Sequence, residues 1–309
     1  MRAQRNLLDG DRWHFSHGPI DALISAEGDA DAVAVAHRDA WLRFEGLLDE
    51  LVAELPLLRR PVTADGPSGS ALRGPVARRM WNACAPFAAT QFVTPMAAVA
   101  GAVAQELIAS YQRPGIDRAW VNNGGDIALH IASGQSVRVG LFADLARFDL
   151  RGGMPVETDA QFTVDASHPV RGIATSGWRG RSFSLGIADS VTVLAATAAQ
   201  ADAAATVIAN ALNVVDAAIR RLPASECKDD SDLGDLLVTV DVPVLPPETV
   251  RRALDAGAAC ARALQQGGHV WAVVLVCQGQ WRRIEPPSAV ASPYARPPHS
   301  AFFPEVPVP

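Results

Sequence analysis

Segments with helical periodicity alternate with apolar, strand-forming segments over residues 1–284 of this chain. Between 31 and 55, apolar side chains recur at spacings of three and four, which predicts one amphipathic helix. Further helices are expected over 76–85, from Pro95 onward, over 198–212 and over 247–265. Strands are expected as a hairpin over 13–26, at 119–121, 127–131 and 137–142, near Phe162, Ile173 and Phe183, and at 191–195, 236–240 and 270–277. This mixture predicts an α+β domain over 1–284, built as one body or as two intertwined lobes.

Proline dominates the stretch 285–309. Its eight prolines in 25 residues exclude a helix or an interior strand, because proline lacks a backbone N–H and fixes φ. The stretch is therefore expected to be an extended arm or a disordered tail. Phe302 and Phe303 could anchor such an arm on a second subunit, which would make the protein a homodimer.

Composition and charge narrow the class of protein. Hydrophobic residues make up 49% of the 309 residues, which is typical of a globular chain. The 27 basic and 33 acidic residues give a net charge of −6 without a basic block, so nucleic acid is not an expected partner. The longest apolar run, around 270–277, is far shorter than the ~20 residues that span a bilayer, so no membrane is expected either. Four scattered cysteines and a start without an apolar signal segment favour the cytoplasm.

The helix expected from Pro95 begins with recognisable signals. Thr94 is expected to cap this helix, and Pro95 suits its first position. The small residues Ala97, Ala98 and Gly101 would let another backbone or a ligand approach the helix closely.

A glycine-rich segment follows the strand expected at 119–121. Asn123, Gly124, Gly125 and Asp126 could bring backbone N–H groups close to an anionic or planar ligand, because glycine tolerates positive φ. The same four residues equally suit a plain hairpin turn of the Asn-Gly type.

A second segment carries two hydroxyls and a glycine where the strand near 173 ends. Thr175, Ser176 and Gly177 could present donors to a phosphate, although such residues also form local turns with the backbone. Arg179 and Arg181 follow directly. Their guanidinium groups could clamp a phosphate or a carboxylate, or could be solvated surface charges.

Asp202 and Thr206 lie four positions apart on the helix expected over 198–212, and hence on one face of it. A carboxylate and a hydroxyl are oxygen ligands of the kind that Mg²⁺ takes, and Mg²⁺ keeps room for water or a substrate phosphate. Alternatively, Asp202 only interacts favourably with the positive end of its own helix.

These segments occur in a recognisable order along the chain: 95–104, 122–126, 174–177, 189–193 and 201–206. The order resembles the ApbE-like superfamily, whose best-known members are Mg²⁺-dependent flavin transferases that take FMN from FAD and attach it to a threonine or serine of a target protein. Within it, the chain is similar to an uncharacterised cytosolic UPF-type branch whose members carry a stretch like 95–102. The resemblance implies a duplicated T-fold-like architecture, with mixed and antiparallel sheets packed with helices.

The resemblance also implies roles for individual residues. Asp202 and Thr206 match the side-chain metal ligands, and a backbone carbonyl near Ala97 or Ala98 would be the third ligand. The segments 123–126 and 175–177 match the parts that line the nucleotide site. The implied cofactors are Mg²⁺ and FAD or FMN, and the implied partner is a phosphorylated small molecule.

The interval 178–188 departs from the transferase pattern. Flavin transferases carry a histidine-containing segment ending in Asp-Pro-x-Thr-Gly there, whereas this interval has neither a histidine nor an Asp-Pro pair. The related branch tends to place a histidine near Arg181. Two alternatives to a transferase therefore stay open: a non-catalytic protein that binds or carries the cofactor, and a pathway enzyme acting on another cofactor such as a pterin in one-carbon metabolism.

Overall fold

An antiparallel sheet of nine strands forms the centre of the protein. The computed structural model describes residues 2–63, 69–141, 160–228 and 231–287. In sheet order, the strands are β1 (Gln4–Leu8), β2 (Arg12–His17), β3 (Ile20–Gly28), β4 (Ile116–Asn123), β5 (Asp126–Ile131), β8 (Gly172–Ser176), β9 (Ser190–Ala195), β12 (Ala272–Cys277) and β13 (Gln280–Ile284). Two antiparallel sheets of two strands each lie outside this sheet: β6 (Ser136–Leu141) with β7 (Ala160–Asp165), and β10 (Arg220–Pro223) with β11 (Leu237–Asp241).

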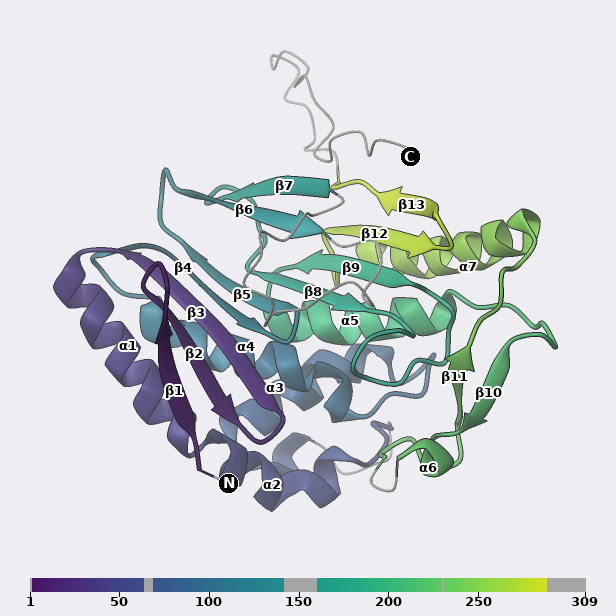
Figure 1. The fold of residues 1–309 in the computed structure, drawn as a ribbon, viewed down its shortest axis with the longest axis horizontal. Coiled ribbons are helices and arrows are strands. Elements are labelled where there is room, and N and C mark those ends of the chain that lie inside the picture. The colour runs from purple at the N-terminus through teal and green to yellow at the C-terminus, as the bar shows by residue number, and fades with distance from the viewer. Residues whose placement is uncertain (1, 64–68, 142–159, 229–230, 288–309) are drawn as a thin grey trace, which may run out of the picture.

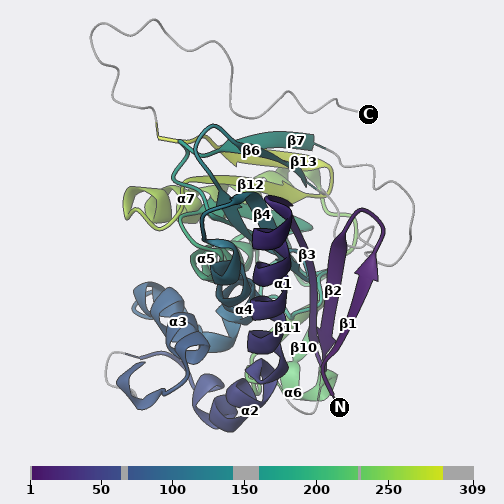
Figure 2. The ribbon, with the colours of Figure 1, turned by 90° about the vertical axis from the view of Figure 1, so that its left-hand side faces the viewer.

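Helices cover one face of the nine-stranded sheet, and the pair β6 and β7 covers part of the other (Figures 1 and 2). The helices are α1 (Ala30–Glu45), α2 (Leu47–Leu58), α3 (Pro75–Cys84), α4 (Val99–Ile108), α5 (Ala198–Ala211), α6 (Ala224–Cys227) and α7 (Pro247–Gln266). The larger apolar core lies between the sheet and these helices. A smaller core lies on the opposite face, where β6 and β7 pack over β5, β8 and β9.

Alanine makes α5 the most deeply packed helix beneath the sheet. Nine of its 14 residues are buried, most of them alanines, and it contacts β8, β9, α4 and α7. Small side chains permit this close approach on several sides, because the distance between packed elements depends on side-chain size. A Cβ atom on Gly101 of α4 would lie only 2.3 Å from the carbonyl oxygen of Ala198. Glycine at this position therefore allows α4 and α5 to touch.

The amphipathic segment 31–55 is two helices rather than the single helix that its periodicity predicts. Gly46 separates α1 from α2, and its backbone N–H donates to the Phe44 carbonyl at the end of α1. Phe44 and Leu47 are both fully buried, so apolar side chains continue across the break. The periodicity is preserved because both helices bury the same kind of face, and it cannot reveal the bend between them.

Two further expectations need correction. Phe183 lies outside the strands, in a turn-rich segment between β8 and β9. Thr94 does not cap the helix with its side chain; its hydroxyl instead donates to Oδ2 of Asp232 at 2.5 Å. Pro95–Ala98 forms a 3₁₀ turn before α4 begins. At Thr94, the local capping signal is overridden by a contact with a residue 138 positions away in the chain.

Other expected elements are present with small shifts. The hairpin over 13–26 is β2 and β3, and the helix over 247–265 is α7. The strands that flank α7 belong to different sheets, since β11 pairs with β10 and β12 pairs with β9. Most of the expected arm, 288–309, lies outside the described residues, so the arm and the homodimer stay predictions.

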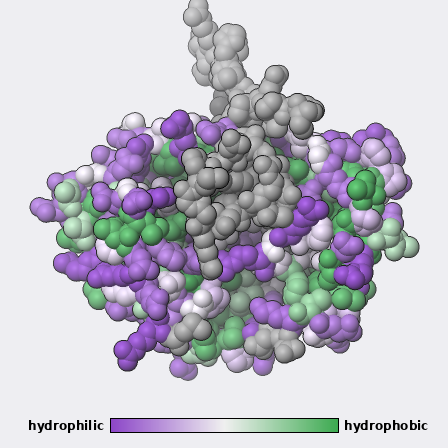
Figure 3. Space-filling model, in the orientation of Figure 1, coloured by the Kyte–Doolittle hydropathy of each residue, from purple (hydrophilic) through white to green (hydrophobic). Residues whose placement is uncertain are grey.

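The surface carries mixed polarity on the side shown in Figure 3. Where described residues are visible there, hydrophobic and hydrophilic residues are interspersed. None of the helices in the described ranges is both long enough and apolar enough to cross a bilayer.

Candidate functional site

The glycine-rich segment is a tight turn between two central strands. Asn123 ends β4 and pairs with Asp126, which begins β5, so only Gly124 and Gly125 connect them. Both glycines have positive φ, of 68° and 113°, which side chains with a Cβ rarely adopt. Oδ1 of Asn122 accepts a hydrogen bond of 2.8 Å from the Gly125 N–H. The segment is therefore a hairpin turn, and both glycines are required by its geometry.

Asn123 connects this turn to the helical layer. Its Nδ2 donates to the Ala100 carbonyl at 3.1 Å, and its Oδ1 accepts from the Asp21 N–H at 3.3 Å. Asn123 is buried, and these contacts use both ends of its amide. The side chain thus fixes the first turn of α4 against the ends of β3 and β4.

Asp202 lies on α5 opposite the start of α4. Its Oδ2 accepts a hydrogen bond of 2.8 Å from the Gly101 N–H. Hydrogen bonds from the N–H groups of Gly101 and Ala100 stabilise the ionised carboxylate, because the first N–H groups of a helix have no partner within it. Asp202 therefore faces the N-terminal end of a neighbouring helix.

Asp126 and Asp202 form an electrostatically coupled pair beneath the sheet. Burial raises the pKa of Asp202 well above its ordinary value, and the negative charge of Asp126 raises it further. Burial likewise raises the pKa of Asp126, opposed by a hydrogen bond of 3.3 Å from the Thr175 N–H to its Oδ1. Two carboxylates in one buried place disfavour each other's ionised form. A cation between them would remove that penalty.

The hydroxyl segment is divided between the two faces of the sheet. Successive side chains of a strand point to opposite faces. Ala174 packs in the core beneath the helices, whereas Ile173 belongs to the smaller core on the other face. The Thr175 hydroxyl accordingly lies on the face away from α5, 2.9 Å from Oγ1 of Thr192. Only its backbone N–H contacts Asp126, while Ser176 alternates back toward the helices.

Gly177 is required by close packing at the end of β8. A Cβ there would lie 2.5 Å from the carbonyl oxygen of Asp189 and 2.9 Å from that of Ala188. The Trp178 N–H also donates to the Ala188 carbonyl. The glycine therefore allows the chain to fold back on itself directly after the hydroxyl segment.

The two arginines point to different neighbours. A Cβ on Gly124 would lie 3.2 Å from Nη1 of Arg181, so this guanidinium stands directly over the glycine turn. Arg179 stacks over Trp178, with 4.9 Å between the guanidinium carbon and the ring centroid. Its Nε is 4.0 Å from Oδ1 of Asp189. Arg181 is thus part of the site around the turn, and Arg179 is turned toward Asp189.

Thr206 and Ala98 are the remaining residues that the sequence suggested as metal ligands. Thr206 is partly buried on α5, one helical turn after Asp202. Ala98 is buried at the junction between the 3₁₀ turn and α4, where φ of −126° and ψ of 14° depart from helical values. Gly101, which contacts Asp202, follows three positions later. The elements that carry Ala98, Asp202 and Thr206 are therefore in direct contact.

The chemistry of these residues suits a hard dication. Asp126 and Asp202 supply carboxylate oxygens, and Mg²⁺ commonly binds one or two carboxylates together with water and a substrate phosphate. Within the described ranges, no three His, Cys, Asp or Glu side chains gather so that they could hold a metal ion. A cation here would therefore also need hydroxyl, carbonyl, water or ligand oxygens.

Two residues near the site were missed by sequence reasoning. Cys84, at the end of α3, is fully buried, and the charge of Asp202 contributes to raising its pKa after burial itself. Asp189 is nearly buried before β9, and its Oδ2 accepts a 2.5 Å hydrogen bond from the Gln278 N–H. The cysteine carries no motif that could have indicated its place. Asp189 lies in a segment of the ordered series, but its partners come from distant strands.

The sequence of this chain matches a model of a known protein family. The model, described as "AbpE bacteria", matches residues 4–283. The chain belongs to this family. The matched range contains both central carboxylates, the glycine turn and the hydroxyl segment, so the candidate site lies within the AbpE match.

Curated relatives of this AbpE chain are archaeal proteins named UPF0280. One from Methanopyrus kandleri is 39% identical over 221 residues, which are 70% of this chain and 80% of that protein. One from Methanothrix thermoacetophila is 36% identical over 199 residues, or 63% and 75% of the two chains. A third, from Methanospirillum hungatei, is 40% identical over 125 residues, and the match spans 47% of that protein. The resemblance to an ApbE-like family with an uncharacterised UPF branch is thus confirmed.

Solved structures with a similar course of the chain also exist. The ApbE protein of Thermotoga maritima has a TM-score of 0.42 and 12% identity, covering 91% of this chain and 96% of that one. The flavinyl transferase ApbE of Pseudomonas stutzeri, in its apo form, has a TM-score of 0.41 and 12% identity, covering 92% and 95%. For the AbpE chain itself, the expected α+β class with antiparallel sheets and packed helices is confirmed. The duplicated T-fold stays a prediction.

Proposed function

We propose that this AbpE-family protein binds a phosphorylated flavin, FMN or FAD, together with Mg²⁺ at the site formed by the 123–126 turn, α5 and the start of α4. The observation that carries the proposal is the coupled pair of Asp126 and Asp202. The charge of Asp126 raises the pKa of Asp202, and a dication bound between the two carboxylates would offset that repulsion. The assignment of the ligand as a flavin rests on the resemblance of the ordered segments to those of the flavin transferases.

The residues around Asp126 and Asp202 would bind different parts of the ligand and its cation. Asp202 and Asp126 would hold the cation with Thr206 and the carbonyl of Ala98, and the cation would neutralise charge that develops on phosphate oxygens. Hydrogen bonds from α4 orient Asp202 before any ligand arrives. Arg181, above Gly124, is available to donate to a phosphate, since guanidinium donors match phosphate oxygens in pairs.

The reaction that this site could support is transfer of FMN from FAD. A hydroxyl oxygen of a target threonine or serine would form a bond to the FMN phosphorus, and the bond from that phosphorus to the bridging oxygen would break. AMP leaves with the bridging oxygen, and the hydroxyl proton is released. The atoms balance without any oxidant or reductant.

A second candidate function is binding without turnover. It is favoured by the segment 178–188, which contributes two arginines but no histidine to accept the hydroxyl proton. Arg179 is directed toward Asp189 and stacked on Trp178, so it does not replace such a base. A carrier of a phosphorylated cofactor would need only the residues that bind the cation and the phosphate, and no residue that accepts a proton.

Flavin binding and turnover can be measured separately. We expect purified protein to quench FMN or FAD fluorescence more strongly with Mg²⁺ than with EDTA, and Asp202→Asn to abolish the Mg²⁺ effect. Asp255→Asn, on the exposed face of α7, is the matched control and should behave as wild type. Absence of any flavin binding by the wild type, with or without Mg²⁺, would overturn the proposal.

Chromatography of FAD incubated with the protein then separates the two candidates. Release of AMP that requires Asp202 supports transfer or hydrolysis, and retention of intact FAD supports the carrier. A mass spectrum of the ligand that copurifies with the native protein tests the flavin assignment directly, because a pterin has a different mass and absorption spectrum.

A further inference from the structure

A groove lies on the helical side of the protein, between α3, the start of α5 and the loop after α7. Its volume is about 480 Å³, within the range of about 300–1,000 Å³ typical of small-ligand sites. Its polar lining comes from Arg78, Arg79 and Asn82 on α3, Thr197 and Gln200 at α5, and His269. Three separate parts of the chain thus contribute side chains to one concave surface.

The groove is rich in hydrogen-bond donors and positive charge. None of the described residues that line it is Asp or Glu, although acidic residues outnumber basic ones in the whole chain. Arg78 is exposed, and no described carboxylate lies within ion-pair distance of it. Arg78 therefore supplies unbalanced positive charge to the groove, whereas the charge of Arg79 is balanced by Glu106.

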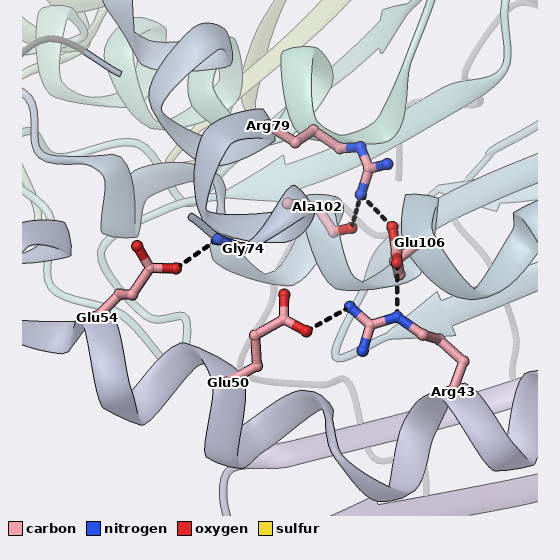
Figure 4. Close-up of polar contacts among 7 residues, drawn as sticks. All are labelled: Arg43, Glu50, Glu54, Gly74, Arg79, Ala102 and Glu106. Atoms are coloured by element: carbon pink, nitrogen blue, oxygen red, sulfur yellow. Dashed lines mark hydrogen bonds and ion pairs between the residues drawn. The ribbon is translucent and has the colours of Figure 1, made fainter. Parts of the chain in front are cut away.

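Arg79 is held in position by a network behind the groove (Figure 4). Its Nη1 donates to Oε2 of Glu106 at 2.8 Å and lies 3.4 Å from the Ala102 carbonyl. Glu106 also accepts a 2.6 Å bond from Nε of Arg43, which in turn contacts Glu50 at 2.9 Å. Both contacts of Arg79 leave from one terminal nitrogen, and the other terminal nitrogen points away from them. The network therefore fixes the guanidinium and leaves other N–H donors for a ligand.

The remaining donors are also held by neighbours. The His269 ring packs against Phe87 in a T-shaped contact with 5.5 Å between centroids. The first N–H groups of α5 are already used, because Ala199 donates to Gln105 and Gln200 donates to Thr197. Recognition in this groove therefore rests on side chains rather than on the helix end.

This groove is separate from the site at Asp202. Residues two positions apart on an α-helix point about 200° away from each other around its axis. Gln200 lines the groove and is directed away from Asp202, which contacts Gly101. Ala199, three positions before Asp202, also lines the groove, so the two surfaces adjoin along α5. The two surfaces share α5 but no lining residue among those described.

We propose that this groove binds a small phosphate-bearing molecule. Two guanidinium groups, two amides, a hydroxyl and an imidazole surround the groove from three sides. This arrangement suits a tetrahedral phosphate, whose oxygens point in several directions, better than a planar carboxylate. The volume exceeds that of a single phosphate and leaves room for the organic part of the ligand.

Calorimetric titration of the full-length protein with inorganic pyrophosphate tests the proposal. We expect binding that weakens as salt is added, because the partners are charged. Arg78→Gln should weaken it by about tenfold or more, the effect of losing one hydrogen bond to a charged group. Arg38→Gln, an exposed arginine on α1, is the matched control and should leave it unchanged. Asn82→Ala provides a second variant in the groove and should also weaken binding.

The other arms of the experiment separate this groove from the flavin site and from carboxylate binding. Asp202→Asn should bind pyrophosphate as the wild type does. The proposal is overturned if the wild type does not bind millimolar pyrophosphate, if Arg78→Gln binds normally, or if Asp202→Asn abolishes binding. Citrate that binds as tightly as pyrophosphate would overturn the assignment to phosphate.

Discussion

The backbone N–H of Gly101 donates a 2.8 Å hydrogen bond to Oδ2 of Asp202, although 101 positions separate the two residues. The contact exists because α4 and α5 approach each other at a glycine. A Cβ at Gly101 would lie 2.3 Å from the Ala198 carbonyl oxygen and 2.8 Å from Cβ of Asp202. The position of Asp202, the candidate metal ligand, thus depends on glycine, which has no side chain, at position 101 of α4.

Gly101→Ala is expected to lower the free energy of unfolding by about 1–3 kcal/mol, the usual cost of forcing an extra methyl into a packed contact. The same change should weaken the effect of Mg²⁺ on flavin binding, because it displaces Asp202. Urea unfolding measures the first effect. Gly46→Ala is the control, since Gly46 has negative φ and no atom within 4 Å of its would-be Cβ. Equal stability of Gly101→Ala and wild type would show that the two helices separate easily.

Asp202→Asn is expected to leave the metal-free protein at least as heat-stable as the wild type. The amide removes one of two mutually repelling carboxylates and still accepts a hydrogen bond from Gly101. Mg²⁺ should raise the melting temperature of the wild type, because a ligand that binds only the folded state stabilises it, and should not raise that of the variant. Thermal unfolding with Mg²⁺ and with EDTA checks both statements. A variant that responds to Mg²⁺ like the wild type would exclude Asp202 as a ligand.

Glu106→Gln is expected to destabilise the protein by about 1–3 kcal/mol, as expected for hydrogen bonds to charged groups. Glu106 is only 13% exposed and forms ion pairs with both Arg43 and Arg79. Its amide replacement would leave two guanidinium groups close together without their shared carboxylate. Glu248→Gln is the control, because Glu248 pairs with Arg251 on an exposed helix surface and should cost little. Denaturant unfolding of both variants provides the comparison, and equal midpoints would contradict the prediction.

His37 is expected to make the protein less stable as the pH falls below the ordinary histidine pKa of about 6.5. Burial lowers the pKa of His37 in the folded state, opposed by the negative charge of Asp11. Below about pH 6.5 the unfolded chain therefore binds a proton that the folded protein disfavours, and the loss continues down to the lowered folded pKa. His37→Gln removes the titration and can still bond the Tyr111 hydroxyl, which lies 2.7 Å from Nδ1 of His37. Its unfolding free energy should fall less between pH 7.5 and pH 5.5 than that of the wild type (about one unit on either side of 6.5).

The elements that could be predicted were those whose signal is local. The helices expected over 198–212 and 247–265 and the hairpin expected over 13–26 are present, and each depends on a few neighbouring residues. The bend at Gly46 could not be predicted, because the apolar pattern runs through it into a second helix on the same core. The position of Phe183 was mistaken because an isolated aromatic residue suits a strand and a packed turn equally.

The candidate site was predictable as a set of segments but not as an arrangement. The sequence indicated that Asp202 and Thr206 share one helix face, and it left the 123–126 segment open between a ligand-binding segment and a plain hairpin turn. Only the tertiary structure brought Asp126 against Asp202, turned the Thr175 hydroxyl to the other face of the sheet, and set Arg181 over Gly124.

By itself, the sequence determined where many of the helices and strands lie, because periodicity and turn residues act over a few positions. It also determined the family, because the order of the short segments can be read directly along the chain. The electrostatic pair, the helix contact at Gly101 and the basic groove were decided by packing between elements as many as 190 positions apart, from Arg79 to His269. Interactions of this kind depend on distance in space, and no local pattern in the chain encodes that distance.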